Sequence, residues 1–206
     1  MTILLVPLVA ETYGRIAGIR ALLDLLDNAI PRSEWHENEA LKHRAEEGDW
    51  EFGDFSVERD ILDERFQFWL PRFAAYSIIT LLYTVIETQL DSCARAAHRK
   101  TAAAFAPKDI RGQGIEAAAT YLARIGTYDV RQDGAWGDIC DLRDLRHLVV
   151  HRAGTKGQSK EHRDTANRLA AKYPGIEFPD SDWTWYGDVW ISLPLCRRWI
   201  DTIEQF

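Results

Sequence analysis

Cysteine is scarce in this 206-residue chain, and the cysteines that it has are far apart. Cys93, Cys140 and Cys196 are odd in number and widely spaced, so a disulfide framework is not expected. We therefore expect them to be small, buried core residues of a protein in a reducing compartment. No Cys-x-x-Cys pair and no Cys/His spacing typical of zinc occurs, so the sequence predicts neither a metal site nor a cofactor.

Long apolar runs are also missing. No run approaches the ~18 residues that a membrane-spanning helix needs. The apolar start from Ile3 to Ala10 is interrupted by Pro7 and has no basic residue before it, unlike a secretory signal. No repeat with a period of about 20 to 50 residues occurs, which argues against a solenoid. We therefore expect a soluble, cytoplasmic protein with no membrane partner.

The chain does contain enough apolar and aromatic residues for a packed core. It is 46% hydrophobic and 11% aromatic, which excludes wholesale disorder. Its formal charge of −7 is segregated: residues 33–64 carry twelve acids and three bases, whereas 95–111 carry five bases and one acid, and 143–163 carry six bases and two acids. A globally acidic protein is not expected to coat nucleic acid indiscriminately. The two basic clusters can meet and form one anionic-ligand site, or each run can simply be a solvated face.

Helical periodicity dominates and predicts an all-α fold in two parts. Residues 1–56 are expected to form an amphipathic helix that ends at Pro31, followed by an acidic, partly irregular connection. Residues 57–206 are expected to form a helical domain that begins with a long helix over 57–99, kinked or broken at Pro71. Apolar residues three and four apart in the second half of that helix predict bundle core rather than a cofactor site; they are Tyr76, Ile79, Tyr83, Ile86, Leu90, Cys93 and Ala97.

The rest of the chain is expected to complete a helical bundle with a small C-terminal β-hairpin. The hairpin follows from two short runs rich in aromatic and branched residues on either side of a Gly-Asp turn. The expected helices cover residues 114–125, 136–150 and 161–172, the strands cover 183–186 and 189–193 around Gly187 and Asp188, and a last helix follows Pro194.

The residues best suited to chemistry lie between Leu142 and Gly154, where two imidazoles and three guanidiniums gather at a helix end. Imidazoles titrate near neutrality and can move protons, and guanidiniums hold phosphate in a bidentate fork. Together they suit phosphodiester cleavage without a metal, in which one group deprotonates a ribose hydroxyl and another neutralises the developing charge. The alternative is structural, because Arg and His near a helix C-terminus also stabilise the helix by roughly 0.3–1 kcal/mol each.

Helix geometry restricts which of these residues can cooperate. Arg143, His147 and His151 share one stripe, whereas Arg146 and His151 lie about 140° apart on an ideal helix. We therefore expect Arg146 and His151 to meet only if the helix ends near Val150, or if a second copy of the chain supplies the partner group. In the second case dimerisation is part of the chemistry.

The run Arg146-His147-Leu-Val-Val-His151 resembles the signature of the HEPN superfamily, an Arg followed by a polar residue and then His after four to six positions. The residues around it, Ile139–Leu145 and Arg152–Gly154, resemble the usual surroundings of that motif, as does the upstream segment Gly112–Leu122. With the long helix before the motif and the hairpin after it, the likeness extends over about residues 57–206.

This resemblance implies a helical domain that forms a homodimer and places two copies of the motif at a shared cleft. It implies a metal-independent endoribonuclease with RNA as substrate, acting as a toxin of a toxin–antitoxin or antiviral defence system, with an antitoxin or regulatory protein as a possible partner. Carried over to this chain, Arg146 and His151 are the catalytic pair and His147 occupies the polar position. We expect His151 to move the proton, Arg146 to neutralise the scissile phosphate, and Arg143 and Arg152 to grip flanking phosphates.

Two other functions remain open, a catalytically inactive HEPN-like module that binds a nucleotide or a partner protein, and a plain structural bundle. Some family members have a Tyr two positions after the His, where a partner nucleotidyltransferase modifies them; this chain has Ala153. Glu87 can orient Arg146 or Arg143 across the bundle, or be an ordinary paired acid. In the acidic stretch, Trp35 and Trp50 are better suited to docking a protein than to stacking bases. The histidines expected to be ordinary surface residues are His36, His43 and His162.

Overall fold

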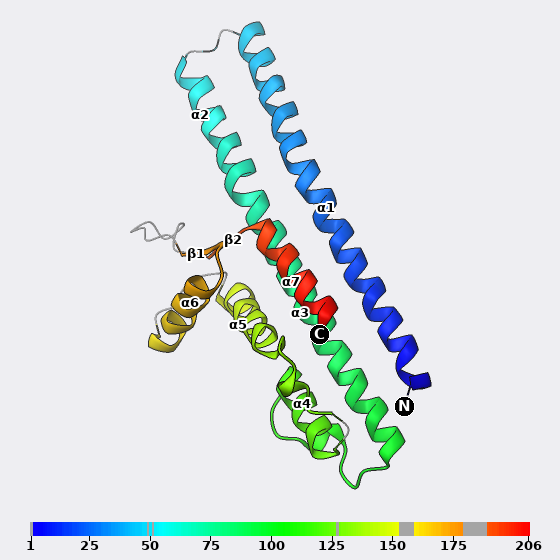
Figure 1. Ribbon diagram of the computed structural model, residues 1–206. Coiled ribbons are helices and arrows are strands. Elements are labelled where there is room, and N and C mark those ends of the chain that lie inside the picture. The colour runs from blue at the N-terminus through cyan, green and yellow to red at the C-terminus, as the bar shows by residue number, and fades with distance from the viewer. Residues whose placement is uncertain (1, 49, 51, 127, 153–158, 179–188) are drawn as a thin grey trace.

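The computed structural model describes the whole chain except residues 1, 49, 51, 127, 153–158 and 179–188. It is an all-α fold with a small C-terminal hairpin, as predicted (Figure 1). The α-helices are α1 Thr2–Glu47, α2 Phe52–Asp63, α3 Leu70–Thr101, α4 Gly114–Arg124, α5 Trp136–Arg152, α6 Lys160–Lys172 and α7 Leu193–Gln205. The shorter elements are the π-helical η1 Glu64–Trp69, the 3₁₀ turns η2 Pro107–Asp109 and η3 Val130–Gln132, and strands β1 Ile176–Glu177 and β2 Trp190–Ile191.

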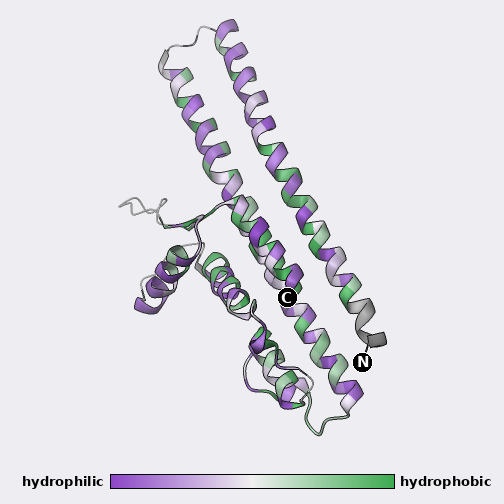
Figure 2. Ribbon diagram, in the orientation of Figure 1, coloured by the Kyte–Doolittle hydropathy of each residue, from purple (hydrophilic) through white to green (hydrophobic). Residues whose placement is uncertain are grey.

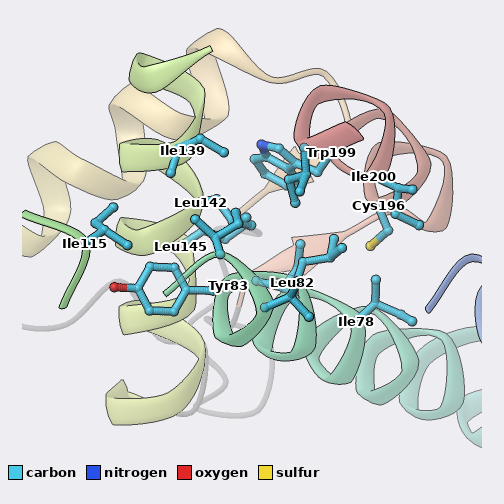
Figure 3. Close-up of a cluster of buried hydrophobic side chains, with 14 of the residues drawn as sticks. Ile78, Leu82, Tyr83, Ile115, Ile139, Leu142, Leu145, Cys196, Trp199 and Ile200 are labelled. Carbon is cyan, nitrogen blue, oxygen red and sulfur yellow. The ribbon is translucent and has the colours of Figure 1, made fainter. Parts of the chain in front are cut away.

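The central element is α3, and α1, α4, α5 and α7 pack around it. Its apolar seam is buried as predicted: Ile78 and Leu82 meet Leu142 and Leu145 of α5 and Trp199 of α7 in one cluster (Figure 3). Full burial of each large apolar side chain contributes about 1.5–3 kcal/mol. This core holds α5, the helix that carries the Arg/His motif, at a fixed position against α3.

The first helix does not end at Pro31, contrary to the prediction. It is one helix of 46 residues, and most of the acidic stretch expected to be irregular is helical. A proline inside a helix costs about 3 kcal/mol, but the residues after it are mostly strong helix formers. Two ion pairs within the helix, Lys42 to Glu39 at 2.7 Å and His43 to Glu47 at 3.0 Å, add support.

The second half of α1 and the antiparallel α2 form an arm that projects from the bundle and has mainly hydrophilic side chains (Figures 1 and 2). The arm has a small core of its own, in which Leu41, Leu62 and Phe66 are buried. Trp50 is partly buried against this core rather than exposed, whereas Trp35 is 59% exposed as expected. The first half of α1 contributes to the main core through Ile16, Ile19 and Leu23. The predicted division between residues 56 and 57 falls within α2 and stays a prediction.

The helix is not broken at Pro71. Instead the chain passes through the π-helical η1, where the Leu70 N–H donates to the Arg65 carbonyl, and Pro71 then lies at the start of α3. A proline cannot donate to the carbonyl of the preceding turn, and the π-helical turn directly before Pro71 changes the hydrogen-bond pattern at this position, so the helix continues through it. Where a kink or break was predicted, the structure instead has a change from π-helical to α-helical hydrogen bonding.

The stretch from Gly53 to Thr101 is long and apolar enough to cross a membrane, judged by length and composition alone. No uninterrupted apolar run marks it in the sequence, because polar residues such as Thr80 and Thr84 interrupt its apolar residues. Half of its apolar window is buried against the rest of the chain, and the core helix of a soluble protein passes the same test. The location of the protein therefore stays a prediction.

The hairpin is antiparallel, with Ile176 opposite Ile191 and Glu177 opposite Trp190. The predicted strand over 189–193 is confirmed at β2, and its partner in the described part of the chain is β1. The other predicted strand, residues 183–186, and its turn at 187–188 lie outside the described residues. Gly175 before β1 has φ +101°, and a Cβ there would collide with Ser192 Oγ, so the close approach of the two segments requires glycine.

Candidate functional site

The Arg/His motif lies on the outward face of α5. Ile139, Leu142 and Leu145 are fully buried against the core, so the residues on the opposite side of the helix point away from it. His147 and His151 are exposed. The amphipathic pattern thus presents both imidazoles to solvent and to the neighbouring helix α6.

A cluster of charged groups fixes α5 against α6. Asp141, only 4% exposed, accepts hydrogen bonds from Lys172 Nζ at 2.6 Å and Tyr173 Oη at 2.8 Å, and also from Arg168. Asp138 accepts from the same Lys172 at 2.9 Å and Tyr173 at 2.7 Å. Burial raises the pKa of Asp141, but the hydrogen bonds from Lys172, Arg168 and Tyr173 outweigh it and leave the pKa below its ordinary value. Both carboxylates are therefore charged and bind the C-terminal end of α6 to the N-terminal half of α5.

Arg146 and His151 meet within one chain. Arg146 Nη1 lies 3.2 Å from His151 Nε2. The first of the two predicted conditions agrees with this contact, since α5 ends at Arg152, two residues after Val150, and no second copy is needed for the two side chains to meet. Five residues rise only about 7.5 Å, and the long Arg side chain reaches that far. A guanidinium can only donate, so in this contact Arg146 Nη1 is the donor and His151 Nε2 is the acceptor.

The Arg146 side chain crosses the ring of Tyr83 on α3. The guanidinium carbon is 5.7 Å from the ring centroid, a cation–π contact. Arg146 Nε is buried and has no hydrogen-bond partner among the described residues, whereas Nη1 of the same guanidinium contacts His151. Tyr83 belongs to the apolar seam predicted for the long helix. It is indeed buried, and the pattern gave no sign that it also contacts Arg146.

Glu87 reaches Arg146 only through Tyr83. The Tyr83 hydroxyl donates to Glu87 Oε1 at 3.4 Å, and no hydrogen bond or ion pair joins Glu87 to Arg146 or Arg143 in the described part of the chain. Burial and the charge of Glu87 raise the pKa of Tyr83 to about 12, although the two arginines oppose this. Gly114 at the start of α4 has φ +63°, and a Cβ there would lie 2.8 Å from Glu87 Oε1. The glycine before α4 therefore lets this helix approach the Tyr83–Glu87 pair.

A third imidazole joins the two on α5. The ring centroids of His147 and His151 are 4.7 Å apart, and those of His147 and His162 are 6.2 Å apart with the planes 26° from parallel. Ser159 Oγ, at the N-cap of α6, lies 2.6 Å from His162 Nδ1 and helps to fix this ring. His162 was expected to be an ordinary surface residue. Its place beside His147 depends on the packing of α6 on α5, which no local pattern encodes.

Arg143, the predicted phosphate grip, is engaged by acids. Its Nη1 donates to Glu116 Oε1 at 2.9 Å, and its Nε and Nη2 donate to Asp144 Oδ1 at 3.0 and 2.9 Å. Its charge is thus balanced locally. The side chain of Arg152, the other predicted grip, lies outside the described part of the structure, as do Ala153 and Gly154.

The described side chains include no group of three or more His, Cys, Asp or Glu residues that could hold a metal ion. The groups gathered at this site are the guanidinium of Arg146, the ring of Tyr83 and the three imidazoles. Comparisons of the chain with protein-family models, with curated proteins and with solved structures found no match.

Proposed function

We propose that this chain is a metal-independent HEPN-type endoribonuclease that cleaves RNA phosphodiester bonds. The observation that carries the proposal is the 3.2 Å contact between Arg146 Nη1 and His151 Nε2 on an exposed helix face. The neighbouring imidazoles of His147 and His162 add groups that can carry a proton. The resemblance of residues 146–151 to the HEPN signature supports the same reaction.

In the proposed reaction His151 takes the proton from a ribose 2′-hydroxyl, and the resulting oxygen attacks the adjacent phosphorus. The bond from phosphorus to the 5′-oxygen breaks, and that oxygen takes up a proton from a neighbouring imidazole. Arg146 donates to the phosphate oxygens and neutralises the charge that develops on them. The products are a 2′,3′-cyclic phosphate and a 5′-hydroxyl end. DNA is not a substrate because it lacks the attacking hydroxyl.

The resemblance extends the proposal to the biological setting. We propose a cytoplasmic homodimer that acts as a toxin in a toxin–antitoxin or antiviral defence system, with an antitoxin or regulatory protein as its partner. Trp35, exposed on the acidic arm, is the side chain best placed to dock such a protein.

One observation favours a second candidate, a catalytically inactive HEPN-like module that binds a nucleotide or a partner protein. Arg143 is already bound by Glu116 and Asp144, so a phosphate must compete with two carboxylates for it. A site with fewer free cations holds a polynucleotide less tightly. The cleavage experiment separates the two candidates.

The test is an assay of purified protein with labelled single-stranded RNA in EDTA. We expect cleavage by the wild type and losses of at least about 100-fold in Arg146→Ala and His151→Ala, because each removes a group that acts in the transition state. Cyclic phosphate ends identify the reaction.

His43→Ala is the matched control, since His43 is an exposed imidazole on the arm that pairs only with Glu47 within the described chain. It should cleave as the wild type does. If the folded wild type leaves diverse RNA intact but binds a nucleotide or a protein, the second candidate replaces the first. Equal cleavage by wild type and both alanine variants would mean a contaminating nuclease.

A further inference from the structure

A cavity separate from the Arg146 site is lined by residues of α1, α3 and α7 together with residues of α4 and η3. Both α1 and α7 pack against α3, and Figure 1 shows how these three helices are arranged. The cavity has a volume of about 510 Å³, within the range of small-molecule sites. It shares no lining residue with the Arg146 site. The apolar residues at its walls include Ile16, Ile86, Leu90, Leu122, Val130 and Ile203.

Part of this apolar lining is exposed to water. Among the lining residues, Val9 is 44% exposed, Tyr13 is 53% exposed and Tyr128 is 55% exposed. Covering apolar surface stabilises a complex by about 25 cal/mol for each Å² removed from water. The cavity therefore favours a ligand with an apolar body over a nucleotide or a sugar.

The charged groups of the cavity indicate which head group such a ligand carries. Glu204 and Lys100 are the charged residues of the described lining. Glu204 is paired with Arg20 at 2.9 Å, and the same guanidinium pairs with Asp201 at 2.7 Å. Lys100 is exposed in the last turn of α3, and no hydrogen bond or ion pair engages it anywhere in the described chain. The Lys100 ammonium can therefore pair with the single anion of a ligand.

We propose that this cavity binds a linear aliphatic carboxylate, with its chain against Ile86, Leu90 and Leu122 and its carboxylate at Lys100 Nζ. A lone ammonium is a point charge suited to one small anion. The proposal does not depend on the ribonuclease function, because it concerns other residues and another class of ligand.

The rate at which the Cys93 thiol is alkylated reports whether a ligand occupies the cavity. It lies in the cavity wall and is partly buried, and burial raises the pKa of its thiol. At alkaline pH a small maleimide can still alkylate it, and a bound aliphatic chain will shield it. Cys196 is fully buried, so a Cys140→Ser background leaves Cys93 as the accessible thiol among the three cysteines.

The experiment measures decanoate binding to the full chain by calorimetry and by slowed alkylation of Cys93. We expect saturable binding of decanoate, weaker binding of 1-decanol, and a loss of about 2–5-fold in decanoate affinity in Lys100→Gln. Lys42→Gln, an exposed lysine on the arm, should bind as the wild type does. Lys100→Glu should favour decyltrimethylammonium over decanoate.

A variant that fills the cavity tests the location. Ala97 is a small residue in the wall, and Ala97→Phe should abolish binding of both decanoate and decanol while the circular dichroism stays unchanged. Absence of saturable decanoate binding by the wild type, or undiminished binding by a folded Ala97→Phe protein, would overturn the proposal. If Ala97→Phe does not fold, the Lys100→Glu variant still tests the proposal, because Lys100 is exposed. A Lys100→Glu protein that still prefers decanoate to decyltrimethylammonium would refute the contact between the carboxylate and Lys100.

Discussion

At the scale of single residues, the placement of His162 makes the sharpest prediction about catalysis. His162 and His151 flank His147, so one imidazole can accept a proton while another donates one. A reaction that needs one group deprotonated and another protonated gives a bell-shaped dependence of rate on pH. We predict that His162→Ala lowers kcat at least about tenfold and removes the alkaline limb of that profile.

The measurement is the rate of RNA cleavage as a function of pH, with KM determined separately. A loss confined to KM would assign His162 to substrate binding, and an unchanged profile would exclude it from proton transfer. His36→Ala is a suitable control, because this exposed imidazole on α1 makes its ring contact with Trp35.

The sequence predicted the two central residues of the site but not their neighbours. Arg146 and His151 are found by local spacing, because both belong to one helix. Tyr83 and His162 come from α3 and α6, and they meet Arg146 and His147 only after these helices pack on α5. A single sequence records which residues a helix buries, but not which side chain of one helix lies opposite which side chain of the next.

At the scale of elements, the cluster of charged groups around Asp141 that joins α5 to α6 leads to a prediction about stability. Asp141 is buried and accepts from three donors, whereas Lys172 and Arg168 are about half exposed and can be solvated if it is removed. We predict that Asp141→Asn lowers the free energy of unfolding by about 2 kcal/mol at neutral pH.

The pH dependence of this loss follows from the lowered pKa of Asp141 in the folded chain. Its contribution is fully present above the ordinary pKa of 3.8 and is lost as the pH falls through the lower folded value. In urea titrations, the difference between wild type and Asp141→Asn should therefore shrink below about pH 4. Asp164→Asn, at an exposed position on α6 without an ion pair in the described chain, should show no such difference. If the difference in free energy of unfolding between wild type and Asp141→Asn stays the same at low pH, the loss of stability comes from altered packing rather than from the charge of Asp141.

The helices that follow α3 in the chain were the easiest to predict. The helices expected over 114–125, 136–150 and 161–172 agree with α4, α5 and α6 to within two residues. The arm was harder, because a two-helix hairpin buries only a narrow stripe, with Leu41 and Leu62 at its centre. Its weak apolar pattern therefore suggested an irregular segment, although strong helix formers, the Lys42–Glu39 ion pair and the burial of Leu41 together continue α1 past Pro31.

At the scale of the whole molecule, charge is segregated in space as it is in the sequence. The described acidic residues of 33–64 lie on the arm and η1, whereas the described basic residues between 143 and 163 lie on α5 and α6 (Figure 1). The arm also has its own small core, separate from the main cluster. The molecule thus consists of a bundle that carries the candidate site and an acidic arm suited to contacts with other proteins.

The proposed homodimer is a property of the whole molecule. A substitution at Val150 tests whether it forms. The Arg146–His151 contact forms within one chain, so a second copy is needed only to build the shared cleft. Such a cleft places the ends of two α5 helices side by side, and the interface must then include residues next to His151. Val150 is a large apolar side chain there, and it is 44% exposed in the single chain.

We predict that Val150→Asp weakens self-association at least about tenfold, because two carboxylates at a symmetric interface lie near each other and lose hydration. Sedimentation velocity over a range of protein concentrations measures the effect. Ile61→Asp, at an exposed apolar position on the arm, should remain dimeric. A wild type that stays monomeric at micromolar concentration while cleaving RNA would show that one chain holds a complete site, and dimerisation would then have no part in the chemistry.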